Sequence, residues 1–305
     1  MKNGCEHNMA LSSEYGIKKG YPKLRKHFGK LVGYLQLCRA FTLVAPILAG
    51  VFGVLTPVKN ITFSSITTAV FVGVTLALAQ ACGQSLNQYA DADLDKLAKP
   101  YRPIPSGLIT REEALGLGWL LALFALGRAF TISDFFGLIV IALLFFAVFY
   151  SLSPFSPRKV NPLLNTSWMA ISRGLLPVLA VWSVFGALSV SAWNYSILAF
   201  LWVFGFQATK DVGDAEVDRQ FHIKTIPNTW GTMGLLATMG ISSLMFSIYA
   251  IISGAYIMLT LLIFAVIAML TVKKQAILTE NTISWMCFYL GLGFFYIIMF
   301  LTFHL

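Results

Sequence analysis

The chain alternates between long apolar runs and short polar connections. About 20 consecutive apolar residues allow a helix to cross the hydrocarbon core of a bilayer, and every run approaches that length. The pattern predicts an all-α membrane protein with nine transmembrane helices around a central cavity. The helices are expected over residues 37–56, 64–87, 113–131, 134–151, 163–187, 193–210, 232–252, 255–272 and 283–303.

A different pattern precedes the first run. Residues 1–20 are polar, and residues 22–36 repeat apolar side chains at helical spacing with basic side chains between them. Such a segment is typical of a helix that lies on an anionic membrane surface. We therefore predict a basic tail with an amphipathic interfacial helix over residues 1–33, followed by one membrane domain over residues 34–305.

The composition agrees with this class, since 57% of the 305 residues are hydrophobic and 11% are charged. The net charge of +9 could also indicate binding to nucleic acid. The basic residues, however, lie in the tail and in alternate connections, as membrane orientation requires, so we expect no nucleic-acid partner. The four cysteines are scattered and form no CxxC pair, which argues against a disulfide framework or a zinc site.

The distribution of basic residues also predicts orientation. The tail and the connections after the second, fourth, sixth and eighth runs are rich in Lys and Arg, whereas the opposite connections hold Lys59 and, at a run end, Arg128. Connections rich in Lys and Arg stay in the cytoplasm. We therefore expect the N-terminus and the ends of the even-numbered helices on the cytoplasmic side.

One acidic stretch leaves the second apolar run. Asn87, Asp91 and Asp95 are spaced i, i+4, i+8, so a continuous helix would present all three on one face, with Asp93 pointing away. Acids this close to a bilayer are costly and mark a functional site. A row of oxygen ligands suits a hard divalent cation, Mg²⁺ before Zn²⁺.

A second acidic stretch leaves the sixth run, with Asp211, Asp214 and Asp218 spaced i, i+3, i+7 and Glu216 pointing away. Across a cleft, like charges about 4 Å apart would repel by roughly 4 kcal/mol per pair at an effective dielectric near 20. Metal ions would remove this repulsion and let a polyanion such as diphosphate bind through them. The alternative is a pair of solvated acidic loops.

The two stretches suggest an internal repeat. Asp91 and Asp211 lie 120 residues apart, each at the end of an even-numbered run. A four-helix unit duplicated over residues 34–155 and 160–275, with a ninth helix appended, would bring both stretches to one central cavity.

Cationic and polar side chains near the acids are candidates for binding the diphosphate. Arg102 lies in the stiff segment KPYRPIPSG, and Tyr150, Arg158 and Lys159 lie in YSLSPFSPRK after the fourth run. Side chains of this kind can equally be solvated or interfacial belt residues. The full set of candidates is Arg39, Arg102, Tyr150, Arg158, Lys159, Lys210 and Lys224.

Two arginines, Arg39 and Arg173, fall inside apolar runs, where a central arginine costs about 2.5–3.5 kcal/mol. Each should find a carboxylate, a carbonyl or a ligand phosphate, although Arg39 lies near a helix end and can also snorkel. Asn165 shares a face of the fifth run with Arg173, and we expect both to line the cavity and meet the acceptor.

Together, these motifs resemble the UbiA superfamily of membrane prenyltransferases. The resemblance rests on NQYADADLDKLAKPYRPIPSG, YSLSPFSPRK and KDVGDAEVDRQFHIKTIPNTWG, which follow in the family's order at the ends of the expected helices. Gln88, where many members have Asp, is a departure that lies off the acidic face. The family pattern NxxxDxxxD falls on Asn87, Asp91 and Asp95, the pattern DxxDxxxD on Asp211, Asp214 and Asp218, and the Tyr-Ser segment with its basic residue on Tyr150, Ser151 and Lys159.

The resemblance implies transfer of an isoprenyl group from an isoprenyl diphosphate, such as geranylgeranyl diphosphate, to a lipophilic acceptor. Two Mg²⁺ ions would join the acids to the diphosphate, whose departure leaves an allylic carbocation in a dry cavity. The implied metal ligands are Asn87, Asp91, Asp95, Asp211, Asp214 and Asp218, with Asp91, Asp95, Asp214 and Asp218 as catalytic residues.

The acceptor stays open at this point, because relatives use aromatic compounds, a tetrapyrrole carboxylate or a glycerol phosphate lipid. RPIPSG is similar to both the chlorophyll-synthase-like and the digeranylgeranylglyceryl phosphate synthase branches, and KDVGDAEVDRQFHIKT is nearer to the homogentisate and chlorophyll branch. A divalent-cation transporter is an alternative of another class. It would also place carboxylates in the membrane, but cations clustered beside the acids would repel its ion.

Overall fold

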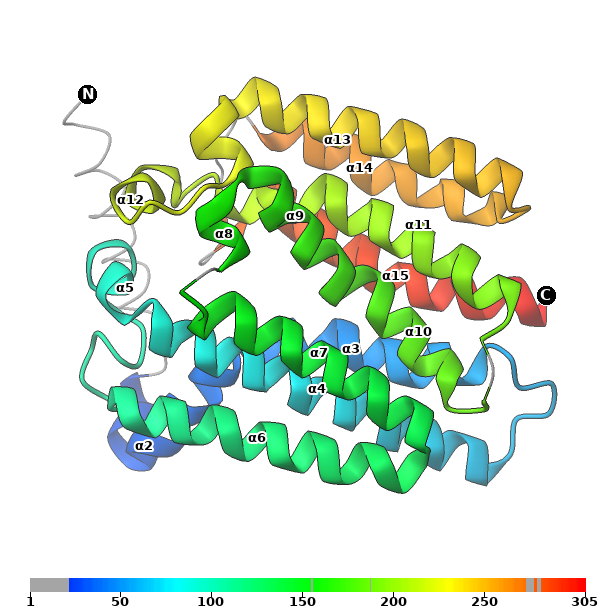
Figure 1. Cartoon of the computed structure of the whole chain (residues 1–305), viewed down its shortest axis with the longest axis horizontal. Coiled ribbons are helices and arrows are strands. Elements are labelled where there is room, and N and C mark those ends of the chain that lie inside the picture. Colours follow the sequence, from blue (N-terminus) through cyan, green and yellow to red (C-terminus); the bar gives the residue numbers. More distant parts are fainter. Residues whose placement is uncertain (1–21, 155, 187, 273–276, 279–280) are drawn as a thin grey trace.

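The computed structural model describes residues 22–154, 156–186, 188–272, 277–278 and 281–305, without the side chains of residues 22–28, 277, 278 and 281. Its helices run side by side as one elongated bundle (Figure 1). The first half contains α2 (Pro22–Cys38), η1 (Ala40–Leu43), α3 (Val44–Leu48), η2 (Ala49–Gly53), α4 (Phe63–Ala90), α5 (Ala92–Ala98), α6 (Arg111–Ile132) and α7 (Asp134–Leu152).

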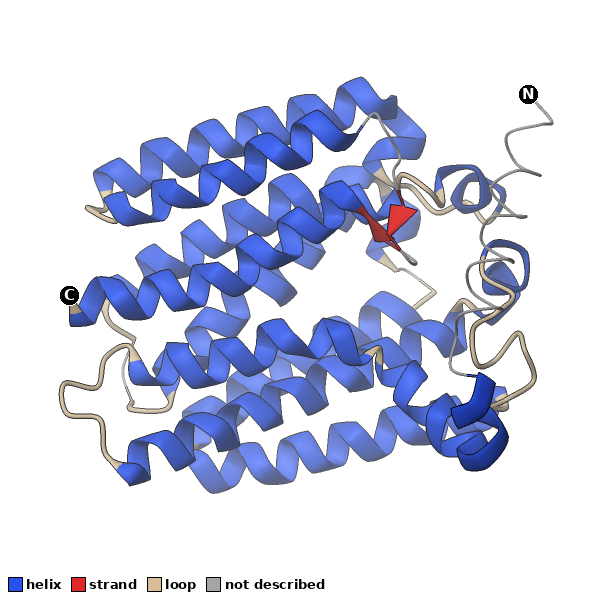
Figure 2. Ribbon diagram, turned by 180° about the vertical axis from the view of Figure 1, so that it is seen from behind, coloured by secondary structure: helices blue, strands red, loops and turns tan. Residues whose placement is uncertain are grey.

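The second half repeats the alternation of long helices and short end helices. It contains α8 (Pro157–Val160), α9 (Pro162–Ala170), η3 (Ile171–Leu175), α10 (Leu176–Ser183), α11 (Val190–Phe206), η4 (Gln207–Asp211), α12 (Ala215–Gln220), α13 (Ile226–Ile252), η5 (Tyr256–Leu261), α14 (Leu262–Thr271) and α15 (Ile283–His304). A two-stranded antiparallel sheet, β1 (Ile277–Leu278) with β2 (Asn281–Thr282), precedes α15, and Figure 2 shows it at one end of the bundle.

Among the described residues, five helices are long and apolar enough to cross a membrane, namely α4, α6, α7, α13 and α15. A sixth span results if Gly29–Cys38 and Ala40–Gly53, bent by 46° at their break, are taken together. The other expected runs coincide with helices that are shorter or interrupted, namely α9 to α10, α11, and η5 to α14. The protein is therefore a multi-pass helical membrane protein, and the count of nine stays a prediction.

Local capping chemistry sets where several of the helices begin. The side chain of Thr62 accepts from the Ser65 N–H at the start of α4, and the side chain of Thr110 accepts from the Glu113 N–H at the start of α6. Pro162 occupies the first turn of α9, where its missing N–H is not needed.

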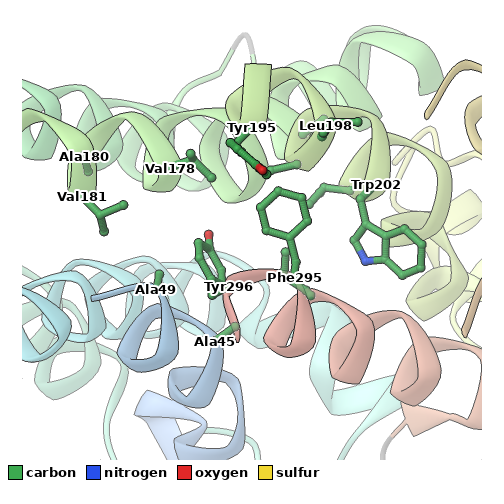
Figure 3. Packing of buried hydrophobic residues seen from close by; sticks show 14 of the residues in the cluster. Ala45, Ala49, Val178, Ala180, Val181, Tyr195, Leu198, Trp202, Phe295 and Tyr296 are labelled. Atoms are coloured by element: carbon green, nitrogen blue, oxygen red, sulfur yellow. The ribbon is translucent and has the colours of Figure 1, made fainter. Parts of the chain in front are cut away.

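Small residues let the helices approach closely around the core. A Cβ built on Gly50 of η2 would lie 2.1 Å from the Gly73 Cα of α4, and one on Gly174 of η3 would lie 2.5 Å from the Ala199 carbonyl oxygen of α11. Close packing of this kind is typical of membrane helices, which gain little from the hydrophobic effect within lipid. The core also contains large buried side chains such as Trp202 of α11 (Figure 3).

The N-terminal helix agrees with its prediction only in part. Helix α2 covers the expected segment but breaks at Gly29, whose φ of 38° and ψ of −112° are not helical. The side chains of residues 22–28, on which the amphipathic pattern depends, lie outside the described residues. Leu37 is buried and packs in a small cluster with Ile109 and Ala114. The interfacial position and the division at residue 34 stay predictions.

Candidate functional site

The two acidic stretches lie at the same end of the bundle, where the short helices α5, α8 and α12 gather (Figure 1). A cavity opens there between the two halves of the chain. Its lining includes most of the residues singled out from the sequence, namely Arg39, Asn87, Asp91, Asp95, Arg102, Tyr150, Arg158, Arg173, Lys210, Asp211, Asp214 and Asp218.

The first acidic stretch is not one continuous helix. Helix α4 ends at Ala90, and Asp91, with φ of −92° and ψ of 10°, separates it from α5. The side chain of Asn87 donates to Asp91 Oδ2 at 2.8 Å, which fixes the orientation of this carboxylate at the break. Asp95, one turn into α5, is only 1% exposed. The expected i, i+4, i+8 face is therefore bent at its centre, although all three side chains still line the cavity.

The second acidic stretch is also interrupted. Asp211 ends the 3₁₀ turn η4, Asp214 immediately precedes α12, and Asp218 lies within α12 with 6% exposure. Asp93 and Glu216 point away from the cavity as expected, and each forms an exposed ion pair with a cation three residues on. The two breaks curve the backbone around the cavity, so acids from α5, η4 and α12 face it together with Asp91 and Asp214 at the breaks.

Cations from distant parts of the chain compensate the acids. Arg158 Nη1 and Nη2 donate to the two oxygens of Asp91 at 2.8 and 2.6 Å. Arg102 Nη1 lies 2.8 Å from both oxygens of Asp95. The Lys99 ammonium pairs with Asp214, and Lys210 Nζ lies 3.5 Å from Asp211 Oδ1. In this structure, Arg and Lys side chains thus relieve the charge repulsion between the two acidic stretches.

Asp218 differs from the other cavity acids, because no ion pair to it occurs within the described residues. Burial, together with the nearby charges of Asp211 and Asp214, raises the pKa of Asp218 to about 8. The pKa of Asp214 is instead lowered, because Lys99 and the other cations outweigh the effect of its burial. At neutral pH the cavity therefore holds one carboxyl that is largely protonated beside one that is ionised.

Three candidates from the sequence lie outside the cavity lining. Lys159 is exposed, Lys224 Nζ donates to the Val160 carbonyl at 3.0 Å, and Asn165 Nδ2 donates to the Lys224 carbonyl at 3.0 Å. These contacts fasten α8 and α9 to the segment before α13. The contacts of Lys224 indicate a role in holding Arg158 in position, since the Lys224 N–H also donates to the Arg158 carbonyl.

The structure also identifies cavity residues that sequence reasoning missed. Lys99 lies in the segment KPYRPIPSG, where the sequence does not distinguish it from other loop cations, and its partner Asp214 lies 115 residues away. Gln207 and Trp285 line the cavity as well. Neither belongs to a charged motif, and no sequence signal distinguished Trp285 from the other aromatic residues.

The donor chemistry fits a hard divalent cation, because the acids supply carboxylate oxygens and Asn87 an amide oxygen. Within the described residues, however, no group of three His, Cys, Asp or Glu side chains is placed to hold a metal ion. Asp91, Asp95 and Asp214 each point toward a cation instead. Metal binding would therefore require these side chains to change partners.

Comparison with known proteins gives a consistent result. The model of the UbiA prenyltransferase family matches residues 43–298. The chain is 33% identical over 198 residues to a digeranylgeranylglyceryl phosphate synthase from Pyrococcus abyssi, covering 64% of this chain and 67% of that protein. It is 28% identical over 156 residues to the chloroplastic chlorophyll synthase of Arabidopsis thaliana, covering 49% of this chain and 40% of that protein.

Two solved structures from archaea share this fold. A UbiA homologue from Archaeoglobus fulgidus, bound to GPP and Mg²⁺, has a TM-score of 0.67 at 19% identity, covering 90% of this chain and 100% of that one. The apo structure of a UbiA homologue from Aeropyrum pernix K1 has a TM-score of 0.65 at 20% identity, covering 87% and 98% of the two chains. These similarities show a shared fold.

Proposed function

The chain belongs to the UbiA prenyltransferase family and is a prenyltransferase, and we propose that it moves an isoprenyl group from an isoprenyl diphosphate to a lipophilic acceptor within the membrane. The observation that carries this proposal is the convergence of two acidic stretches, 120 residues apart, on one cavity rimmed with Arg and Lys. The relative from Archaeoglobus fulgidus that was solved with GPP and Mg²⁺ supports the choice of donor and metal.

We propose that two Mg²⁺ ions bind between the acidic stretches. When bound, Mg²⁺ would neutralise the diphosphate and stabilise it as a leaving group. The proposed ligands are Asn87, Asp91, Asp95, Asp211, Asp214 and Asp218, with Asp91, Asp95, Asp214 and Asp218 as the catalytic members.

Binding of the isoprenyl diphosphate and the metal would break ion pairs in the cavity wall and give their side chains new partners. Arg158, Arg102 and Lys99 now pair with carboxylates and would be released when those carboxylates take up metal. Each released cation remains beside the cavity and can donate to diphosphate oxygens, an arrangement that favours the charge developing on the leaving group. The same residues would thus compensate acids in one state and the diphosphate in the other.

Arg39, Tyr150 and Lys210 complete the proposed diphosphate surroundings, since all three line the cavity. Tyr150 lies beside Arg158, whose guanidinium carbon is 5.4 Å from the centre of the Tyr150 ring. Lys159 and Lys224 lie outside the lining. The proposal gives Lys224 a positioning role for α8 and gives exposed Lys159 no contact with the donor.

The remaining wall suits an allylic carbocation. It is lined by apolar and aromatic side chains that exclude water, which would otherwise capture the cation before the acceptor does. A nucleophilic oxygen or carbon of the acceptor would then attack C1 of the isoprenyl chain and lose its proton, which the departed diphosphate can accept. We propose an aromatic compound, a tetrapyrrole carboxylate or a glycerol phosphate lipid as the acceptor, and the similarity to a digeranylgeranylglyceryl phosphate synthase favours the last.

Diphosphate release by the purified protein tests the proposal. We expect release from geranylgeranyl diphosphate that requires both Mg²⁺ and an acceptor from a panel of aromatic acids and glycerol phosphate lipids. The absence of release with every acceptor, combined with Mg²⁺ flux into protein-containing vesicles, would instead support the divalent-cation transporter.

A further inference from the structure

Two exposed lysines at the cavity end of the bundle have no acidic partner. Lys159 lies in α8, and Lys224 lies in the segment between α12 and α13. Both are exposed, and in the part of the chain that the structure describes no carboxylate pairs with either. Neither lines the cavity, so the diphosphate site does not account for their charges.

Other exposed cations at this end of the bundle are compensated by acids. Lys96 Nζ lies 2.9 Å from Asp93 Oδ1, and Arg219 Nη1 lies 2.7 Å from Glu216 Oε2. The acids that could serve exposed cations here are therefore already paired. The contrast indicates that Lys159 and Lys224 face an anion from outside the described chain.

A hydrogen bond holds the Lys224 ammonium against the segment that carries Lys159. Lys224 Nζ donates to the carbonyl of Val160 at 3.0 Å, and Val160 directly follows Lys159. The main chain of Lys224 is fixed too, because its N–H donates to the Arg158 carbonyl and its carbonyl accepts from Asn165 Nδ2. Two positive charges held on one short segment repel each other, and an anion between them removes that cost.

Apolar side chains lie exposed beside these cations. Val160 is 48% exposed, Leu163 45% and Leu164 40%. Helix α8 lies at the end of the bundle where α5 and α12 also lie, just after the candidate span α7 ends, so this region is close to the membrane boundary (Figure 1). We name as the α8 surface the residues Lys159, Val160, Leu163, Leu164 and Lys224.

A surface of this composition fits an anionic phospholipid. The phosphate of the lipid would pair with the ammonium groups, while its upper acyl chains would contact the exposed aliphatic side chains. The charged connections predict that this end of the bundle faces the cytoplasm, and the cytoplasmic leaflet carries anionic lipids that attract basic segments. An acidic protein segment would match the charges but leave the aliphatic side chains uncovered.

We propose that the α8 surface docks one anionic phospholipid, whose headgroup binds Lys159 and Lys224. The bound lipid fastens α8 to the membrane surface. Because Arg158 of α8 pairs with Asp91, the lipid also steadies one wall of the cavity from outside.

Binding of the first lipid to the purified protein tests the surface without turnover. The probes are phosphatidylglycerol and phosphatidylcholine, followed by native mass spectrometry. We expect phosphatidylglycerol to bind at least about tenfold more tightly, since two lysines contribute to its affinity. Lys159→Gln and Lys224→Gln should each weaken phosphatidylglycerol binding about fivefold, the usual effect of one lysine near an anionic lipid surface, and leave phosphatidylcholine binding unchanged.

Lys96→Gln is the matched control. It removes an exposed lysine from the same end of the bundle, but one whose charge Asp93 already compensates, so phosphatidylglycerol should bind this variant as it binds the unchanged protein. Equal losses in all three variants would indicate a general attraction to positive charge and overturn the α8 surface. Equal binding of the two lipids to the unchanged protein would overturn it as well.

Two further probes distinguish the phospholipid from other anions. Inorganic phosphate should not displace phosphatidylglycerol, and Leu163→Ser should weaken phosphatidylglycerol binding with both lysines in place, because the acyl chains contribute. Displacement by phosphate together with full binding to Leu163→Ser would overturn the lipid as the occupant. Geranylgeranyl diphosphate with Mg²⁺ should bind alongside phosphatidylglycerol on one protein molecule, whereas mutual exclusion would assign the lysines to the diphosphate and overturn the docking surface.

Discussion

Asp91 and Asp218 line the same cavity, yet their surroundings give them different properties. Asp91 accepts two hydrogen bonds from Arg158, so its negative charge is compensated. Asp218 is buried without an ion pair within the described residues, and its pKa is raised to about 8. The identity of the residue alone could not have revealed this difference, because it depends on cations that lie far away in the sequence.

Replacement of Asp218 should separate stability from activity. Asp218→Asn keeps the shape of the side chain and removes the cost of protonating this carboxyl on folding, so the metal-free protein should melt at a higher temperature at pH 7. Mg²⁺-dependent turnover should fall by about 10²–10³-fold, the usual effect of losing one charge-stabilising group. Thermal melting and diphosphate release measure the two effects. Turnover equal to that of the unchanged protein would exclude Asp218 as a ligand.

The raised pKa also predicts a pH dependence. In the unfolded chain an aspartate ionises near pH 3.8, whereas folded Asp218 ionises near pH 8. Between these values the folded state binds the extra proton, so the contribution of this group to stability falls as pH rises. The melting temperature of the metal-free protein should therefore decline more steeply from pH 5 to pH 8 than that of Asp218→Asn. Parallel curves for the two proteins would contradict the assignment.

Replacement of Asp91 should destabilise the protein, whereas replacement of Asp218 should stabilise it. Asp91→Ala leaves the Arg158 guanidinium, 7% exposed, without its carboxylate, which typically costs about 3–5 kcal/mol. The sequence alone would predict a fold that tolerates this change, because the ion pair spans 67 residues. Adding Arg158→Ala should restore much of the melting temperature but none of the turnover. If the double variant were as unstable as Asp91→Ala, the unpaired Arg158 guanidinium would not be the cause of the lost stability.

At the level of elements, the apolar pattern located every expected run on a helical segment, but it could not locate the breaks. Helical spacing assumes a straight helix, and the chain departs from it at Asp91 and at the π-turns η2 and η3. The three-dimensional arrangement sets these breaks, since each lies where helices pack or a cavity residue must turn inward. The ion pairs between the cavity acids and Arg or Lys could not be predicted for the same reason, because Lys99 and Asp214 belong to different halves of the chain.

The contact between η3 and α11 predicts an element-scale effect. Gly174→Ala would bring a methyl group to 2.5 Å from the Ala199 carbonyl oxygen and force η3 away from α11. Overpacking of this kind typically costs about 1–3 kcal/mol.

Gly127→Ala is the control for this change. Gly127 lies in α6, and no atom lies within 4 Å of the place where an added Cβ would be. An added methyl group should therefore be neutral or stabilise the helix by up to about 1 kcal/mol. Denaturation monitored by helical circular dichroism compares the two variants. Equal stability of both would show that the η3–α11 contact can relax.

On the scale of the whole molecule, the order and spacing of the motifs predicted that the two acidic stretches would meet, and the structure places both at one cavity. The charged loops also predict on which side of the membrane that cavity lies, which the bundle alone does not determine. The sequence predicts the cytoplasmic side.

Labelling of single cysteines tests this orientation. In a background without the native cysteines, exposed Glu216 at the cavity end and exposed Lys59 at the other end are each replaced by Cys. A membrane-impermeant maleimide should label Glu216→Cys only in inside-out vesicles and Lys59→Cys only in right-side-out vesicles. The reverse pattern would place the active site outside.

The pairing of the cavity acids with Arg and Lys has a consequence for the order of ligand addition. A divalent ion arriving alone would have to displace Lys99, Arg102 or Arg158 and would then face the cations that it had evicted. Diphosphate arriving alone would meet the acids in the same way. Together, the two ligands offer every displaced group a new counterion. Titrations should therefore show strong thermodynamic synergy, with each ligand binding weakly until the other is present.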